Sequence, residues 1–80
     1  MSTAERVLDV LATVSEIDEV RQDAEMQLFE TQVLDSMKTV ELIVAFSQEF
    51  GVEISPAEFD REQWATPGKI VAYMEAKVGQ

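Results

Sequence analysis

The side chains most often used in enzyme chemistry are missing from this sequence. The chain contains no histidine and no cysteine, so it offers no Ser–His or Cys–His pair and no imidazole or thiolate ligand for zinc. Its three glycines are too few and too scattered for a loop that cradles phosphate. The carboxylates of Glu58, Asp60 and Glu62 lack the spacing of a calcium-binding EF-hand loop. The sequence therefore predicts no independent catalysis and no metal site.

Ser36 is the one residue whose place suggests a chemical role. It follows Asp35 directly before an apolar, helix-like run, and such a pair is commonly only a helix cap, because its side-chain oxygen accepts a bond from a free backbone N–H. The same place exposes a hydroxyl, and the free N–H groups of a helix start favour a bound or attached anion. From the residues alone, a structural cap and an attachment point both stay open.

Capping signals and apolar spacing predict two long helices. Ser2 and Glu5 have the spacing of a capping box, and apolar residues recur three and four apart over 3–15. A second helix follows Ser36 and ends at Gly51, where a left-handed C-terminal residue belongs. The predicted apolar stripes are Val7, Leu8, Leu11 and Val14 in the first helix, and Met37, Val40, Leu42, Ile43, Phe46 and Phe50 in the second.

Two further helices are predicted in the last third of the chain. A short one begins at Ser55, because Pro56 suits the first helical position and Glu58 completes another capping box. The last helix starts at Thr66 and ends at Gly79. The side chains expected to complete the core here are those of Phe59, Trp64, Ile70, Val71, Met74 and Val78.

A weakly periodic stretch, 16–34, separates the two long helices. Its apolar residues predict a loop pinned to the core, with a helical turn near 18–22, and only 52–54 is briefly strand-like. We therefore predict one all-α domain over residues 1–80, a small bundle of three main helices plus one short helix with a long first loop. Each apolar stripe is expected to be used by this core, which predicts a monomer.

Charge narrows the class of partner. Sixteen Asp and Glu against six Lys and Arg give a net charge of −10, which disfavours nucleic acids and anionic membrane surfaces. Proteins with basic patches are the natural partners, although acidity can also serve solubility alone. We see no signal-peptide pattern and no apolar run long enough to insert into a membrane. The expected location is the cytoplasm.

The run LDSMKTVELIVAF at 34–46 resembles the prosthetic-group motif of acyl and peptidyl carrier proteins. The match falls on Asp35, Ser36 and Met37, and on the Val-Glu-Leu triplet at 40–42. This resemblance implies an acyl-carrier-protein-like bundle with 4′-phosphopantetheine esterified to Ser36. The terminal thiol of that arm, rather than a side chain, would hold the cargo as a thioester.

A second stretch, EFDREQWATPGKI at 58–70, is similar to the signature of D-alanyl carrier proteins, and so is Leu-Phe-Glu at 28–30. This resemblance implies a non-catalytic carrier of D-alanine for the D-alanylation of teichoic acids in Gram-positive cell walls. It also implies three partner enzymes: a phosphopantetheinyl transferase, a ligase that loads D-alanine, and a membrane-bound acyltransferase that receives it.

Several residues near the motif have expected contacts. Asp35, Met37 and Val40 are candidate partner contacts, although the place of Val40 in an apolar stripe suits the core equally well. Lys38 and Gln32 stand where D-alanyl carriers often have glycine. Since a cation in the first turn opposes the helix dipole, we expect the Lys38 ammonium to meet the phosphate of the arm or a partner.

Two alternatives stay open. The first is a carrier of fatty-acyl or other small-molecule groups with the same arm, which would need an apolar cavity for a long chain. The second is an acidic helical adaptor without a prosthetic group, in which Ser36 is only the N-cap of its helix.

Overall fold

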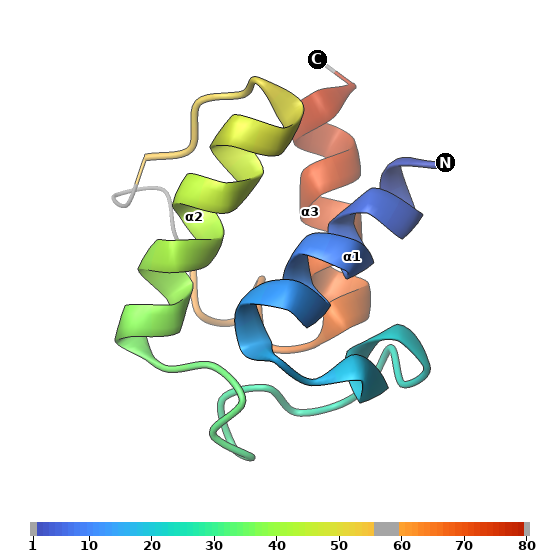
Figure 1. Cartoon of the computed structure of the whole chain (residues 1–80), viewed down its shortest axis with the longest axis vertical. Coiled ribbons are helices and arrows are strands. Elements are labelled where there is room, and N and C mark those ends of the chain that lie inside the picture. Colours follow the sequence, from blue (N-terminus) through green and yellow to red (C-terminus); the bar gives the residue numbers. More distant parts are fainter. Residues whose placement is uncertain (1, 56–59, 80) are drawn as a thin grey trace.

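The computed structural model describes residues 2–55 and 60–79, which form helices joined by loops (Figure 1). These ranges contain α1 (Thr3–Ser15), the 3-10 helix η1 (Asp18–Arg21), α2 (Ser36–Phe50) and α3 (Pro67–Val78), and they contain no strand. The all-α class and the three main helices are thus confirmed, as is the helical turn near 18–22. The short helix predicted from Ser55 falls on 56–59 and lies outside the described residues, as does Phe59.

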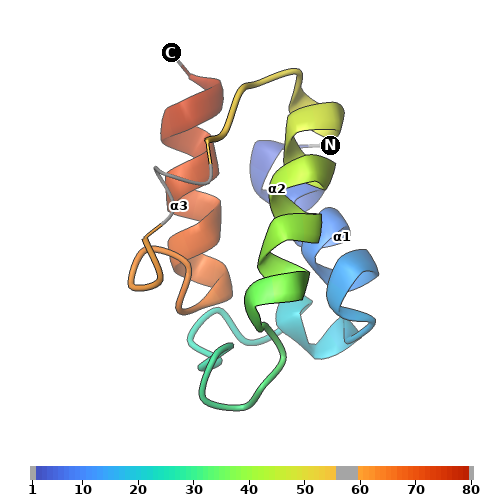
Figure 2. The same cartoon turned by 90° about the vertical axis from the view of Figure 1, so that its left-hand side faces the viewer.

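The first helix contacts both of the others, and η1 packs against it. Figure 2 shows the long connection between α1 and α2 crossing one end of the bundle. The polypeptide enters α2 from that connection, so Ser36 lies at the same end of the molecule as the loop (Figure 1).

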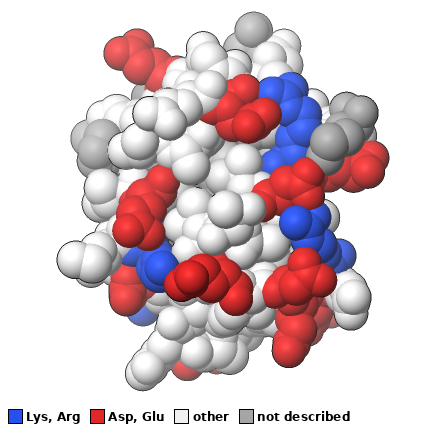
Figure 3. Space-filling model, viewed as in Figure 1, with Lys and Arg blue, Asp and Glu red and all other residues white. Residues whose placement is uncertain are grey.

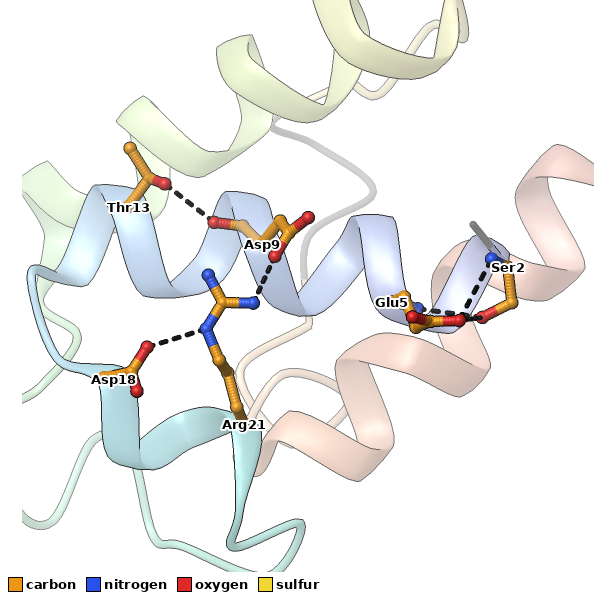
Figure 4. Close-up of polar contacts among 6 residues, drawn as sticks. All are labelled: Ser2, Glu5, Asp9, Thr13, Asp18 and Arg21. Atoms are coloured by element: carbon orange, nitrogen blue, oxygen red, sulfur yellow. Dashed lines mark hydrogen bonds and ion pairs between the residues drawn. The ribbon is translucent and has the colours of Figure 1, made fainter.

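The helix ends follow the predicted capping signals. The Glu5 backbone N–H donates to Ser2 Oγ over 3.1 Å, and Glu5 Oε1 accepts from the Ser2 N–H over 3.3 Å, which completes a capping box (Figure 4). Gly51 closes α2 with a φ of 65°, a left-handed conformation that glycine adopts without strain. Thr66 caps α3, its Oγ1 accepting from the Lys69 N–H over 3.2 Å.

Side chains of α2 and α3 meet at Trp64, which is fully buried. The indole ring packs edge-on against Phe46 and Tyr73, with 5.6 Å between ring centroids in both pairs. Each large apolar side chain buried in this way stabilises the fold by roughly 1.5–3 kcal/mol. Other fully buried members of the core are Val7, Leu11, Leu28, Leu42, Ile70 and Met74.

Backbone hydrogen bonds pin the long loop to the segment before α3. The Leu28 N–H donates to the Ala65 carbonyl, and the Gly68 N–H donates to the Ala24 carbonyl, both over 2.9 Å. A Cβ atom at position 68 would lie 3.0 Å from the Ala24 oxygen, so glycine permits this close approach. Apolar side chains of the loop, those of Val20, Leu28 and Leu34, are buried. The predicted pinned loop is therefore confirmed.

An arginine at the end of η1 joins the loop to α1. The Arg21 guanidinium donates to Asp9 of α1 and, over 2.7 Å, to Asp18 of η1 (Figure 4). Both hydrogen bonds raise the pKa of Arg21, and the one to Asp9 has the larger effect. This contact fixes the start of the loop without burying a charge.

Candidate functional site

Ser36 is the first residue of α2, and the cap of that helix is its neighbour Asp35. The Asp35 carboxylate accepts the Lys38 N–H over 2.8 Å, and the Asp35 carbonyl accepts the Thr39 N–H over 2.9 Å. Asp35 has the extended backbone of an N-cap, with φ −137° and ψ −174°. The alternative in which Ser36 itself caps the helix is therefore wrong.

The Ser36 side chain is exposed and takes no part in holding the helix. Within residues 2–55 and 60–79 its hydroxyl makes no hydrogen bond. Backbone N–H groups in the first turn of a helix lack intrahelical partners and carry partial positive charge. An anion attached to the Ser36 oxygen would therefore lie at the favourable end of α2.

A hollow of about 620 Å³ opens beside Ser36. Its volume lies within the range of about 300–1,000 Å³ that is usual for small-ligand sites. The long loop, α2 and the segment before α3 each contribute to its walls, which combine apolar side chains with a few polar ones. The lining residues are Phe29, Gln32, Leu34, Asp35, Ser36, Thr39, Val40, Ile43 and Arg61.

One lining residue has an uncommon backbone conformation. Gln32 adopts a φ of 63°, a left-handed value that costs a residue with a Cβ atom more than it costs glycine. D-alanyl carriers, which the sequence resembles, often have glycine at this position. The loop therefore has a left-handed residue at position 32 although it is glutamine and not glycine.

Lys38 lies in the first turn of α2 but points toward α1. Its ammonium donates to the Val14 carbonyl over 3.1 Å and lies 3.9 Å from the Glu16 carboxylate and 3.8 Å from that of Glu41. A cation at the last turn of α1 satisfies a free carbonyl and complements the helix dipole. The Lys38 ammonium thus has acceptors at the end of α1, and its expected contact with a phosphate or a partner stays a prediction.

Three apolar side chains of α2 are exposed. Met37, Val40 and Val44 have exposed fractions of 75%, 55% and 51%, and their spacing of three and four places them on one side of the helix. The prediction that the core uses every apolar stripe is wrong for this helix, and so is the reading of Val40 as core. We refer to Met37, Val40 and Val44 as the exposed α2 row.

We did not predict Val44 as a surface residue, although it lies four residues after Val40 and therefore on the same side of the helix. The buried positions of α2 are Thr39, Leu42, Ile43 and Phe46, whereas the exposed α2 row is open to solvent. An apolar helix with three such positions beyond its core stripe can contact another molecule there.

Acidic side chains are spread over one face of the molecule. Figure 3 shows Asp and Glu spread over the face that carries α1 and α2, with Lys and Arg lying next to them. No group of three or more His, Cys, Asp or Glu residues suited to a metal ion occurs in the described part of the chain. Nor do the described helices include one that is long and apolar enough to span a bilayer. Chemically, the arrangement offers a hydroxyl for modification beside a hollow.

Comparison with known proteins identifies the family. The family described as "Phosphopantetheine attachment site" matches residues 5–74. A D-alanyl carrier protein of Lacticaseibacillus casei (strain BL23) is 49% identical over 86% of this chain and 85% of its own length. That of Lactococcus lactis subsp. cremoris (strain MG1363) is 41% identical over 95% and 96%, and that of Listeria monocytogenes serotype 4b (strain CLIP80459) is 40% identical over 95% and 97%. The chain belongs to the D-alanyl carrier protein family, which confirms the resemblance seen in the sequence.

Proposed function

We propose that this member of the D-alanyl carrier protein family carries D-alanine as a thioester on a 4′-phosphopantetheine arm attached to Ser36. The carried D-alanine serves the D-alanylation of teichoic acids in Gram-positive cell walls. The observation that supports this best is the Ser36 hydroxyl, which is exposed at the start of α2 and is not needed for the cap. Residues 1–80 would act as one carrier domain in the cytoplasm.

The surroundings of Ser36 suit such an arm. Its phosphodiester is anionic, and the first turn of α2 favours an anion on the serine oxygen. The hollow of about 620 Å³ beside Ser36 has room for part of the flexible chain. When attached, the arm supplies a terminal thiol that forms the thioester with D-alanine. Since the Ser36 hydroxyl makes no hydrogen bond to a described side chain that could activate it, we expect separate enzymes to attach the arm and load it.

The partners are a phosphopantetheinyl transferase, a ligase that loads D-alanine, and a membrane-bound acyltransferase that receives it. Asp35, Met37 and Val40 are the proposed contacts, since all three are exposed around Ser36. Basic patches on these enzymes would meet a chain of net charge −10, which speeds encounter more than it tightens binding. Met37 and Val40 would supply the apolar part of each contact.

Loading the arm with competing cargoes tests the proposed function. The arm-bearing chain is incubated with ATP, D-alanine and the ligase of a D-alanyl carrier system, and separately with L-alanine or with fatty-acyl donors and their synthetase. We expect a thioester with D-alanine that hydroxylamine releases. A clear preference for fatty-acyl donors would instead establish the alternative carrier and overturn the D-alanine assignment.

A further inference from the structure

Among the described residues, two arginines are stacked on phenylalanine rings, Arg6 on Phe50 at the end of α2 and Arg61 on Phe29 in the loop before α2. The Arg6 guanidinium carbon lies 4.5 Å from the centroid of Phe50, and that of Arg61 lies 4.6 Å from the centroid of Phe29. Such cation–π contacts hold a guanidinium against a ring face and leave its N–H donors free at the edge. The two stacks differ in what those donors meet.

Arg6 has its anionic partner. Its guanidinium lies 3.0 Å from the Glu49 carboxylate and donates to the Glu49 carbonyl over 2.8 Å. No carboxylate of the described residues lies within ion-pair distance of Arg61, although acidic residues outnumber basic ones sixteen to six. The Arg61 guanidinium is thus held on the Phe29 ring and has no carboxylate partner within residues 2–55 and 60–79.

Arg61 lines the same hollow as Ser36. It is the one cation among the described lining residues, and the Asp35 carboxylate is the one anion. A phosphodiester on Ser36 adds a second negative charge to this rim. Lys38, the nearest basic residue in sequence, already donates to Val14 at the end of α1. Arg61 is therefore the cation left to balance the added charge.

We propose that Arg61 binds the phosphodiester of the arm on Ser36, held in place by the ring of Phe29. This inference depends on the proposed attachment of the arm to Ser36. A guanidinium suits the role because its parallel N–H donors match two oxygens of a phosphate group, which an ammonium cannot do. The contact draws the root of the arm toward the hollow and orients the remaining chain.

Nuclear magnetic resonance of the chain before and after attachment tests this contact. Coenzyme A and a broad-specificity phosphopantetheinyl transferase convert the chain, and the intact mass establishes the conversion. The Nε–Hε resonances of the arginines are then compared in the two forms, with Arg6 and Arg21 as internal controls. We expect the Arg61 resonance to shift more than either control.

The phosphorus resonance of the arm gives the reciprocal measurement. We expect it to shift in R61Q relative to the unaltered chain, to shift less in R61K, which keeps the charge, and to stay unchanged in R6Q. An Arg61 resonance that moves no more than that of Arg6, or a phosphorus resonance unaffected by R61Q, would overturn the inference and leave the proposed function standing. Failure of the mass to increase in the folded chain would overturn both.

Discussion

The two ends of α2 differ in what surrounds them. At its N-terminal end, Ser36, Met37 and Val40 are exposed beside a hollow. At its C-terminal end, Phe46 is fully buried and packs 6.2 Å from Phe50, measured between ring centroids. One helix therefore serves the fold at one end and presents a modifiable group at the other.

The two arginine–phenylalanine stacks also differ in their surroundings. The stack of Arg6 on Phe50 is completed by Glu49 and links α1 to the end of α2. The stack of Arg61 on Phe29 borders the hollow and has no such carboxylate among the described residues. A guanidinium that is paired with a carboxylate stabilises the fold, whereas one without such a partner is available to bind a ligand. Substitutions at the two ends should therefore separate stability from function.

The largest expected effect on stability is at the C-terminal end of α2, which we call the closed end because Arg6 there is paired with Glu49. The N-terminal end, beside the hollow, is called the open end. Phe46→Ala should lower the free energy of unfolding by about 3–5 kcal/mol, because it leaves a cavity against Trp64. Val44→Ala, two residues earlier and half exposed, should change it by less than about 0.5 kcal/mol. Urea denaturation followed by circular dichroism measures both. Equal losses would mean that Phe46 does not make the core contact assigned to it.

At the open end the expected effect is on binding. Met37→Ser should raise the KM of the D-alanine ligase for the arm-bearing chain about tenfold, as expected for an apolar contact worth roughly 1.4 kcal/mol. Unfolding should be unchanged, since Met37 is 75% exposed. Gln48→Ala, an exposed site nearer the closed end, is the matched control. A Met37→Ser chain with an unaltered KM would remove the exposed α2 row from the ligase contact.

The next effect concerns two adjacent residues. Asp35→Ala should lower the free energy of unfolding by about 1 kcal/mol, because it removes the cap bond to the Lys38 N–H. Ser36→Ala should lower it by no more than a few tenths, since the serine hydroxyl is not the cap. Thermal denaturation of the unmodified chains compares the two. A larger loss for Ser36→Ala would return the role of cap to the serine.

The smallest expected effect comes from the surface ion pair at the closed end. Arg6→Gln should lower the free energy of unfolding by about 1 kcal/mol or less, because exposed ion pairs contribute little. The loss should shrink at about 1 M salt, where charges are screened. Urea titrations at two salt concentrations measure this. A loss that does not depend on salt would assign the effect to packing on Phe50 instead.

Helix ends were predictable because their signals are local. Ser2 and Glu5, Gly51, and Thr66 before a proline each specify a boundary through contacts within one turn of helix. The long loop was also predictable as a pinned segment, since its apolar side chains need burial. These features agree between sequence and structure because no distant residue has to be known.

The contacts that distant residues determine were not predictable. Periodicity marked Val40 as apolar but could not tell which side of α2 the other helices cover. Lys38 bonds to Val14, a residue 24 positions away, and nothing in the local sequence indicates that contact. Ser36 was found through the motif, whereas the hollow and the place of Arg61 depend on how the loop, α2 and the segment before α3 pack together.

The intact mass of the chain tests the central claim most directly. The chain is incubated with coenzyme A and an active phosphopantetheinyl transferase, beside Ser36→Ala and Ser47→Ala, a serine on the same helix. We predict the gain of one phosphopantetheine by the unaltered chain and by Ser47→Ala, and none by Ser36→Ala. No gain by the folded unaltered chain, or an equal gain by Ser36→Ala, would contradict the assignment of Ser36 as the attachment site.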